Sequence, residues 1–272
     1  MSDLITSKQN ERARHARAVR DGREPELIFI EGLRLCEEAA RAKDLIIIEA
    51  FHTERIERDG SDGRGRALLD LIAHRSVRST LVNDEVFASM SDTKTPPGIV
   101  LIAARPPSDF ETFNAQIKTQ NALIVALNQV NNPSNAGSIM RAAEAAGASG
   151  IIATPHTVNL FSPKTLRGAM GASFRLPCWT GATLSQLSQF CRERNFRTVM
   201  LDVSASASYL ELDWTMPRVV IVGREAHGFD AGELATANDV ISIPMTAPVE
   251  SLNVAVALGI VLYEARRQRS DV

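Results

Sequence analysis

Polar side chains gather directly after a fully apolar segment of the chain. Residues 122–127 (ALIVAL) predict a strand that is buried on both faces, as in a parallel sheet. Open α/β sheets bind ligands at the carboxyl ends of such strands. The loop that follows contains Asn128, Asn131, Asn132 and Asn135. Asx side chains stabilise tight turns, so a well-capped helix would account for these asparagines.

The helix expected after this loop carries residues that helix capping alone does not explain. Gly137 allows close approach of the backbone, and Arg141 lies about one turn into the helix. A guanidinium keeps its charge and presents a fork of donors that matches a phosphate. The arginine therefore indicates an anion-binding site.

A second strand end carries a carboxylate. The segment RVVIVGREAHGFD predicts a strand ending at Gly223, followed by Glu225 and a turn completed by Gly228. Carboxylates at strand ends are frequent site residues, and a structural glutamate that holds loop amides is the alternative. We interpret His227 as a residue at the solvent edge rather than a general base.

The segment IPMTAPVESLNVAVALGIVLYEARR predicts a short strand from Ile243, a proline-bearing loop and a helix whose first turn carries Ser251 and Asn253. The first turn of a helix leaves its amide donors free for a ligand. We therefore expect this point to form one wall of a cofactor and substrate site.

The sequence lacks several common motifs for phosphate and metal binding. GxGxxG and GK[ST] phosphate-binding motifs are absent, and Cys36, Cys178 and Cys191 form no CxxC pair. The five histidines show no metal-ligand spacing either. We expect a reduced, metal-free, cytoplasmic protein. With no apolar leader and no apolar run near the ~18 residues of a membrane helix, we expect no membrane anchor.

The overall charge argues against a protein that coats nucleic acid. A formal charge of −2 and a pI near 6.2 leave only local basic patches for such contacts. Aromatic residues make up only 5%, which disfavours a stacking platform for single strands.

Two stretches are candidates for such basic patches. Residues 7–20 predict a helix that begins with a capping box from Thr6 to Gln9 and carries a cationic face of Lys8, Arg12, Arg14, Arg17 and Arg20. This helix is either a phosphate-contacting arm or a solvated surface helix. After Pro163, Lys164 and Arg167 share one side of a predicted helix and form a second phosphate-facing candidate.

Strands and helices alternate throughout, which indicates an α/β fold. We expect strands at 27–30, 45–51, 77–82 and 98–103 with helices at 32–42 and 66–74, then strands at 122–127, 150–154 and 198–202 and a helix at 184–194. A Pro-Pro pair breaks the pattern near residue 106. The predicted domains are residues 1–104, a linker at 105–118, and residues 119–272.

The second half, about residues 119–268, resembles the SPOUT class of RNA methyltransferases and its SpoU-type (TrmH-like) 2′-O-ribose branch. Three blocks carry this resemblance in order: NNPSNAGSIMRAAEAAG, IVGREAHGFD and IPMTAPVESLNVAVALGIVLYEA. The segment SPKTLRGAMGASFRLP is similar to ribosomal-RNA members of the family. Less specifically, the first hundred residues resemble a small α/β substrate-binding domain, similar to a kink-turn-binding ribosomal protein, that often precedes this domain.

The resemblance implies a parallel-sheet domain with a deep trefoil knot. S-adenosylmethionine would lie bent in the knot, near Gly223, Glu225, Gly228, Ile243, Met245 and Leu252. Family members are homodimers through the C-terminal helix, in which Leu258, Val261 and Leu262 form a plausible apolar seam. A buried core face would look the same.

The resemblance also suggests roles for the polar residues. Arg141 would hold the phosphate beside the target ribose and make its hydroxyl more acidic. Asn135 would position the nucleotide, and Glu225 would orient the arginine or loop amides. Ser251 and Asn253 would complete the pocket. The sequence leaves the proton acceptor open.

Two positions depart from the family pattern in the second block. Ala226 stands where glycine is common, and Phe229 where leucine is common. The leading hypothesis is 2′-O-methylation of structured RNA, above all 23S ribosomal RNA. The alternatives are methylation of transfer RNA, a drug-resistance methyltransferase acting on the same RNA class, and a non-catalytic RNA-binding assembly factor that retains the knot.

Overall fold

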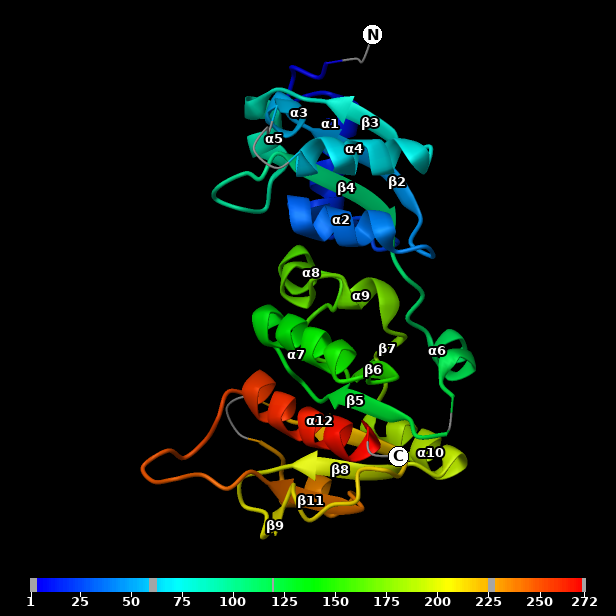
Figure 1. Cartoon of the computed structure of the whole chain (residues 1–272), viewed down its shortest axis with the longest axis vertical. Helices are drawn as coiled ribbons and strands as arrows, with labels where there is room; N and C mark the ends of the chain where they lie inside the picture. Colours follow the sequence, from blue (N-terminus) through cyan, green and yellow to red (C-terminus); the bar gives the residue numbers. More distant parts are fainter. Residues whose placement is uncertain (1–3, 59–62, 119, 225–227, 271–272) are drawn as a thin grey trace. The chain divides into compact units, whose positions relative to one another are not determined.

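The computed structural model describes residues 4–58, 63–118, 120–224 and 228–270 (Figure 1). Contacts divide the chain into two units. The first comprises Met1–Pro106 with Leu160–Arg175, and the second comprises Pro107–Asn159 with Leu176–Val272. This division differs from the predicted domains in the placement of residues 160–175. The predicted linker at 105–118 also contains a helix, α6 (Phe110–Gln116), which Asp109 caps and which buries Phe113.

The first unit is built on a four-stranded sheet in the order β1-β4-β2-β3, counted over the described residues. β1 (Leu27–Glu31) and β2 (Ile47–His52) run antiparallel to β4 (Ile99–Ala104), and β3 (Arg78–Leu81) runs parallel to β2. The helices are α2 (Leu33–Arg41), α3 (Glu54–Arg58), α4 (Arg64–His74) and α5 (Asp84–Met90). The predicted strands are confirmed to within a few residues, whereas the short helices α3 and α5 were not predicted.

α1 (Glu11–Arg20) starts later than the sequence suggested. Asn10 caps it by accepting a hydrogen bond from the amide of Arg12, so the predicted capping box from Thr6 to Gln9 is wrong. Ala13, Ala16 and Val19 are buried in one apolar cluster with side chains of α5 and of the sheet. Because these side chains are small, the helix packs close to α5 and the sheet, and its apolar stripe is narrow.

Residues 160–175 form α8 (Pro163–Ala169) and α9 (Ala172–Arg175). Pro163 occupies the first turn of α8, as the sequence suggested, and Ser162 caps the helix. α8 packs against β1. The guanidinium of Arg105 lies 4.8 Å from the centre of the Phe161 ring. These contacts explain why the segment groups with the first unit although it follows β6 in sequence.

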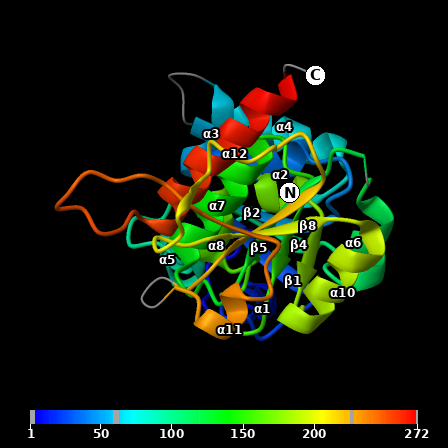
Figure 2. The ribbon, with the colours of Figure 1, turned by 90° about the horizontal axis from the view of Figure 1, so that it is seen from below.

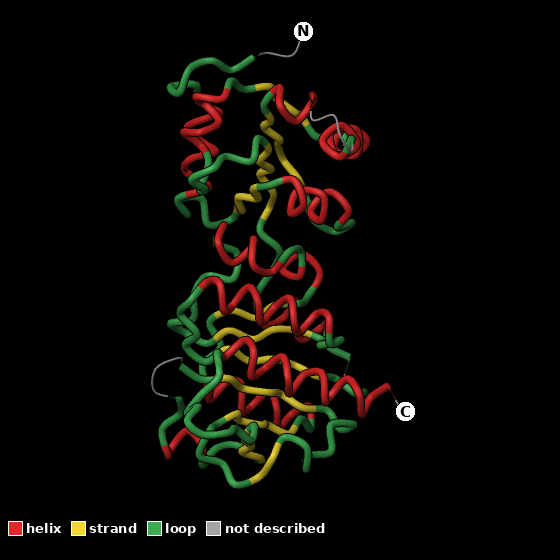
Figure 3. The backbone as a smooth tube through the Cα atoms, turned by 60° about the vertical axis from the view of Figure 1, so that its left-hand side comes forward, coloured by secondary structure: helices red, strands yellow, loops and turns green. Residues whose placement is uncertain are grey.

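The second unit holds a sheet of strands (Figure 3). Within the described part of the chain this sheet is parallel, in the order β7-β6-β5-β10-β8-β11-β9. Its strands are β5 (Leu123–Leu127), β6 (Gly150–Ala153), β7 (Cys178–Thr180), β8 (Arg197–Leu201), β9 (Ala207–Ser208), β10 (Arg218–Val222) and β11 (Asp239–Ser242). β5 and β10 are completely buried, as their apolar sequences require. The strand order reverses between β5 and β10, and this reversal is where such sheets place ligands.

Helices cover both faces of this sheet (Figure 2). α7 (Pro133–Ala145) and α12 (Val254–Ser270) pack together on one face. α6 and α10 (Leu184–Arg194) lie on the other face, where Phe113, Trp179 and Phe190 form a buried aromatic cluster. α11 (Ala231–Leu234) is a single turn that Asp230 caps. The sheet thus has the two covered faces that its all-apolar strands predict.

The closing segment differs in detail from the prediction. β11 ends at Ser242, so Ile243 lies after the strand, and α12 begins only at Val254. Asn253 accepts hydrogen bonds from the amides of Ala255 and Val256, at 2.9 and 3.4 Å, and so acts as the cap of α12. Ser251 therefore belongs to the loop and not to the first helical turn.

The last turn of α12 holds the segment that precedes β10. Gln268 accepts from the Trp214 amide, and Arg269 donates to the carbonyls of Trp214, Met216, Asn121 and Ala122. Burial, with Arg218 nearby, lowers the pKa of Arg269 to about 10. It therefore stays charged at neutral pH, and these carbonyls, all hydrogen-bond acceptors, offset its desolvation.

The apolar seam assigned to the subunit interface lies inside the chain. Leu258, Val261 and Leu262 are each 0% exposed because they face the core beneath α12. The alternative of a buried core face is therefore correct, and the seam was wrongly assigned. Within the described residues, no helix is long and apolar enough to cross a bilayer.

Candidate functional site

A cavity of about 740 Å³ opens at the carboxyl ends of the strands next to the strand reversal. Four stretches line it: the start of α7, the ends of β8 and β10 with the turns that follow, and the closing segment after β11. Eight of the predicted site residues lie on its wall, namely Asn135, Gly223, Gly228, Ile243, Met245, Ser251, Leu252 and Asn253. The fold thus brings together residues from all three sequence blocks.

The start of α7 and the start of α12 meet at this cavity. Asn132 caps α7 by accepting from the amides of Ser134 and Asn135, at 2.9 and 3.4 Å. The Asn253 side chain donates to Oδ1 of Asn135 across 3.1 Å. The contacts at the starts of α7 and α12 thereby hold the Asn135 and Asn253 side chains of the predicted site against each other.

The turn after β10 is shaped by glycine. Gly228 has a positive φ of 59°, which L side chains rarely adopt. A Cβ atom at Gly223 would lie 3.1 Å from the ring of Phe229, which itself is buried and belongs to the core. Phe229, one of the departures from the family pattern, thus fills space beneath Gly223 while also lining the cavity. Ala226, the other departure, lies outside the described residues.

A buried polar network supports the ends of β5 and β10, and the sequence did not reveal it. Thr154 donates to Oδ1 of Asn128, whose amide donates to Glu233 across 3.3 Å. Glu233 also accepts from Arg224 at 2.8 Å. The fully buried Asn128 therefore serves the fold, as the loop-and-cap alternative proposed. Glu233 is 105 residues away in sequence, so no local pattern could pair the two.

Asp202 lines the cavity but was not among the predicted residues. It directly follows β8, as Asn128 directly follows β5. Open α/β sheets bind ligands at the carboxyl ends of their strands, and this rule, applied to the predicted strand ending near residue 202, would have identified Asp202 as a candidate.

One predicted catalytic residue, Arg141, does not line the cavity. Arg141 is exposed on α7 and is not among the lining residues. Six residues separate it from Asn135, about 9 Å along the helix axis. Glu225, a further predicted catalytic residue, lies outside the described residues.

A larger cavity, of about 920 Å³, lies beside α10 and the residues around α11. It includes Arg197 and Thr198 at the amino end of β8, and no predicted site residue lines it. The chemistry of an open α/β sheet occurs at the opposite strand ends, so the smaller cavity is the candidate site.

The predicted basic patches are largely engaged within the first unit. Arg12 contacts Glu49 and Thr80, and its guanidinium lies 5.4 Å from the centre of the Phe51 ring. Arg17 and Arg20 likewise donate to Ser89 or to carbonyls near it. Arg12 is therefore engaged within the first unit, and its contact with RNA stays a prediction. Lys8 is half-exposed and pairs with the exposed Glu85 at 2.7 Å.

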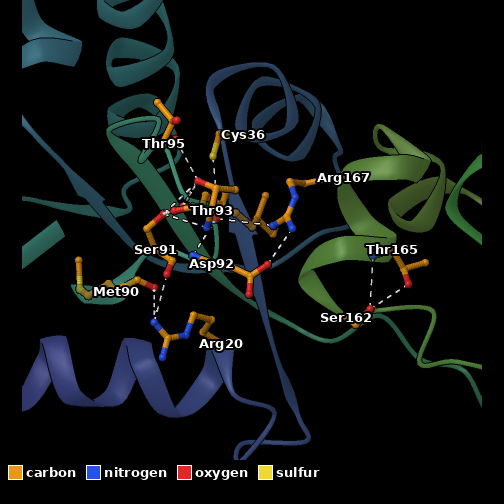
Figure 4. Close-up of polar contacts among 12 residues, drawn as sticks. Arg20, Cys36, Met90, Ser91, Asp92, Thr93, Thr95, Ser162, Thr165 and Arg167 are labelled. Carbon is orange, nitrogen blue, oxygen red and sulfur yellow. Dashed lines mark hydrogen bonds and ion pairs between the residues drawn. The ribbon is translucent and has the colours of Figure 1, made fainter. Parts of the chain in front are cut away.

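Arg167 also faces inward (Figure 4). Its guanidinium lies 2.7 Å from a carboxylate oxygen of Asp92 and 3.6 Å from the fully buried Glu31. Glu31 further accepts from the Ser91 and Thr93 hydroxyls and from the Asp92 amide. Because two carboxylates neutralise Arg167, it is not a free phosphate contact, whereas its neighbour Lys164 is exposed.

The described residues contain no group of three or more His, Cys, Asp or Glu side chains placed to hold a metal. The three cysteines are buried and free. Burial raises the pKa of the Cys191 thiol to about 12 and that of Cys36 still higher. Neither thiol is a nucleophile at neutral pH.

Two family profiles match the chain. The SpoU rRNA Methylase family matches residues 122–263, and the RNA 2′-O ribose methyltransferase substrate-binding family matches residues 29–108. An uncharacterised tRNA/rRNA methyltransferase of Synechocystis sp. is 35% identical over 202 residues, which are 74% of this chain and 72% of that protein. Several mycobacterial relatives are matched over only about half of their own length.

Two further similarities concern ribosomal RNA. The 23S rRNA (uridine(2479)-2′-O)-methyltransferase of Streptomyces viridochromogenes is 29% identical over 181 residues, 65% of this chain and 62% of that enzyme. The AdoMet-bound rRNA methyltransferase of Sinorhizobium meliloti has a TM-score of 0.82 and 27% identity, with 97% of each chain covered. The family match over residues 122–263 covers β5 to α12, including the cavity. This chain belongs to the SpoU family of RNA methyltransferases.

Proposed function

We propose that this protein transfers the methyl group of S-adenosylmethionine to a ribose 2′-hydroxyl in structured RNA, with 23S ribosomal RNA as the favoured substrate. One observation carries the proposal. Residues from the three family blocks, spread along the chain from Asn135 to Asn253, line one cavity at the strand reversal.

The cavity fits the cofactor in size and lining. Its volume lies within the range of about 300–1,000 Å³ that ligand pockets occupy. Leu201, Val222, Ile243, Met245 and Leu252 supply apolar walls for an adenine ring. At Gly223 a Cβ atom would crowd Phe229, and at Gly228 it would lie 3.3 Å from Asp202, so glycine keeps this wall open. S-adenosylmethionine supplies the reactive methyl group, and the protein supplies orientation and charge.

The chain's own residues divide the remaining work. Asn135 and Asn253, fixed by their mutual hydrogen bond, position the target nucleotide with Ser251. Arg141 is exposed, so its guanidinium fork is able to reach a phosphate that approaches α7 from solvent. Glu225 orients the arginine or the amides of the turn, as the family resemblance suggests.

The first unit would recognise the RNA substrate. The substrate-binding family profile falls almost entirely within it. Lys8 and Lys164 remain the proposed phosphate contacts, since an exposed ion pair such as Lys8–Glu85 costs little to break. The 23S rRNA relative and the structural similarity to an rRNA methyltransferase favour ribosomal over transfer RNA. The buried, reduced cysteines suit a cytoplasmic location.

We further propose a trefoil knot and a homodimer. Residues 243–253 would close the knot between β11 and α12, and they line the cavity from there. The dimer would use a different face of α12 from the one first assigned. Val256, Ile260 and Tyr263 are 52%, 36% and 55% exposed and recur at helical spacing, so they form one apolar stripe.

The proposal is tested by incubating the protein with labelled S-adenosylmethionine and deproteinised 23S, 16S or transfer RNA. Label in 23S RNA, mapped to a 2′-O-methyl nucleotide, is the expected result. Label confined to transfer RNA would reassign the substrate. Binding of RNA without any label would favour the assembly-factor alternative.

A further inference from the structure

Asp202 carries the only carboxylate among the described residues that line the cavity. The cation Arg224 on the same wall is already paired with Glu233. None of the roles given above uses Asp202, although a partly buried charge beside a ligand pocket has a large effect on what binds there.

The carboxylate of Asp202 is held in a fixed orientation. Its backbone amide donates to the Ile241 carbonyl at 2.9 Å. Its Oδ1 atom accepts from both the amide and the hydroxyl of Ser204, at 2.9 and 2.6 Å. The first bond holds the backbone of Asp202 and the other two hold Oδ1, so the orientation of the carboxylate and of its second oxygen is constrained.

That second oxygen, Oδ2, accepts no hydrogen bond from any described residue. It lies 3.3 Å from the position that a Cβ atom of Gly228 would occupy, in the glycine turn after β10. A free acceptor on the cavity wall is thus presented between the ends of two neighbouring parallel strands.

We propose that Oδ2 of Asp202 accepts a hydrogen bond from the ribose diol of the bound cofactor. The inference rests on the proposed function. Acidic side chains at strand ends bind ribose hydroxyls in other nucleotide-binding α/β sheets, because a diol offers donors and a carboxylate only accepts. Asp202 is therefore a positioning residue for the adenosine part of the cofactor.

The test is the affinity for three ligands by calorimetry, with wild-type protein and Asp202→Asn. S-adenosylmethionine, S-adenosylhomocysteine and 5′-methylthioadenosine share the ribose, but only the first carries the sulfonium charge. The variant keeps an acceptor for Ser204 and loses the charge. We expect all three dissociation constants to rise by a similar factor of about ten or more, because hydrogen bonds to charged groups are the strong ones.

Asp213 offers a matched control. Its Oδ1 accepts from the amide and hydroxyl of Thr215 at 2.9 and 2.6 Å, the same local geometry, but Asp213 does not line the cavity. Asp213→Asn should leave all three affinities unchanged. A loss of binding in both variants would mean that Asp202→Asn acts through the fold, which would overturn the inference.

Deoxy ligands test whether the group that contacts Asp202 is the ribose diol or another part of the ligand. The 2′-deoxy and 3′-deoxy forms of S-adenosylhomocysteine should bind wild type more weakly, and removal of the contacting hydroxyl should cost nothing further in Asp202→Asn. Weakening confined to S-adenosylmethionine would assign the contact to the sulfonium charge and overturn the inference, as would unchanged affinities. If wild type bound none of the three ligands, the proposed function itself would fail.

Discussion

Arg141 is the residue on which the proposed chemistry depends most. It lies outside the cofactor cavity, so its loss should affect the RNA reaction and not cofactor binding. We expect Arg141→Ala to lower the methyl-transfer rate by roughly 100-fold or more, the range seen when one charge-stabilising donor is removed. Arg141→Lys should recover only part of the rate, because a lysine keeps the charge but not the fork.

The measurements for this prediction are single-turnover methyl transfer and calorimetry with S-adenosylhomocysteine. An unchanged dissociation constant is expected for both Arg141 variants. Loss of cofactor affinity together with activity would show that the arginine supports the cavity, contrary to the proposed role.

Among the residues around Arg167, Glu31 is the one whose substitution is expected to lower the stability of the fold most. It is fully buried and collects two hydroxyls, one amide and a guanidinium. Glu31→Ala removes an acceptor from the Asp92 amide and leaves Arg167 paired with Asp92 alone, and loss of a buried hydrogen-bond acceptor costs about 1–3 kcal/mol. We expect a clear fall in the urea midpoint of the first unit.

A matched control lies on the same unit. Glu38 pairs with Arg175 at 2.7 Å, but both side chains are more than a third exposed. Surface pairs contribute about 0–1 kcal/mol, so Glu38→Ala should hardly move the midpoint. Equal effects of the two substitutions would contradict the buried role of Glu31.

At the scale of elements, α12 combines a core face with an exposed apolar stripe. If Val256, Ile260 and Tyr263 form the subunit contact, a charge there should separate the subunits. We expect Ile260→Glu with Tyr263→Glu to sediment as a monomer. Leu210→Glu, at a position 57% exposed outside α12, should leave the sedimentation unchanged. A dimer that persists in the double variant would exclude this stripe.

The end of α12 also responds to acid. Hydrogen bonds from Arg267 and then from Gln268 lower the pKa of Glu264 from 4.5 to about 2. Because the folded carboxyl binds its proton more weakly than the unfolded one, this stabilisation is complete above about pH 4.5 and is lost as the pH falls towards 2. Glu264→Gln should therefore be less stable than the parent at pH 7 and closer to it at pH 3. The difference in urea midpoints measures this, and a constant difference would refute it.

At the scale of the whole molecule, local patterns predicted what depends on neighbouring residues. The apolar run at β5 and the amphipathic pattern of α10 gave those elements nearly to the residue. α6 was missed because the Pro-Pro pair and turn formers before it suggested a linker, although Asp109 is a good cap. Short helices such as α3 carry too few turns to show periodicity.

Local sequence patterns also predicted part of the site. Asn135, Ser251 and Asn253 stand in segments whose spacing marks strand and helix ends, so their position on one cavity followed from the fold. The internal pairing of Arg12 and Arg167 could not be predicted, because the carboxylates that pair with them, Glu49 and Glu31, are distant in sequence. A surface arginine and a paired one look identical until the chain is folded.

The placement of residues 160–175 has a practical consequence for dissecting the gene. They interrupt the second unit in sequence yet pack with the first, so no single cut separates the two units. A fragment that begins at Pro107 would carry α8 and α9 without β1, against which α8 packs, and without Arg105, which lies over the ring of the buried Phe161. Such a fragment is expected to aggregate, whereas one in which a short flexible loop replaces these residues keeps every wall of the cavity.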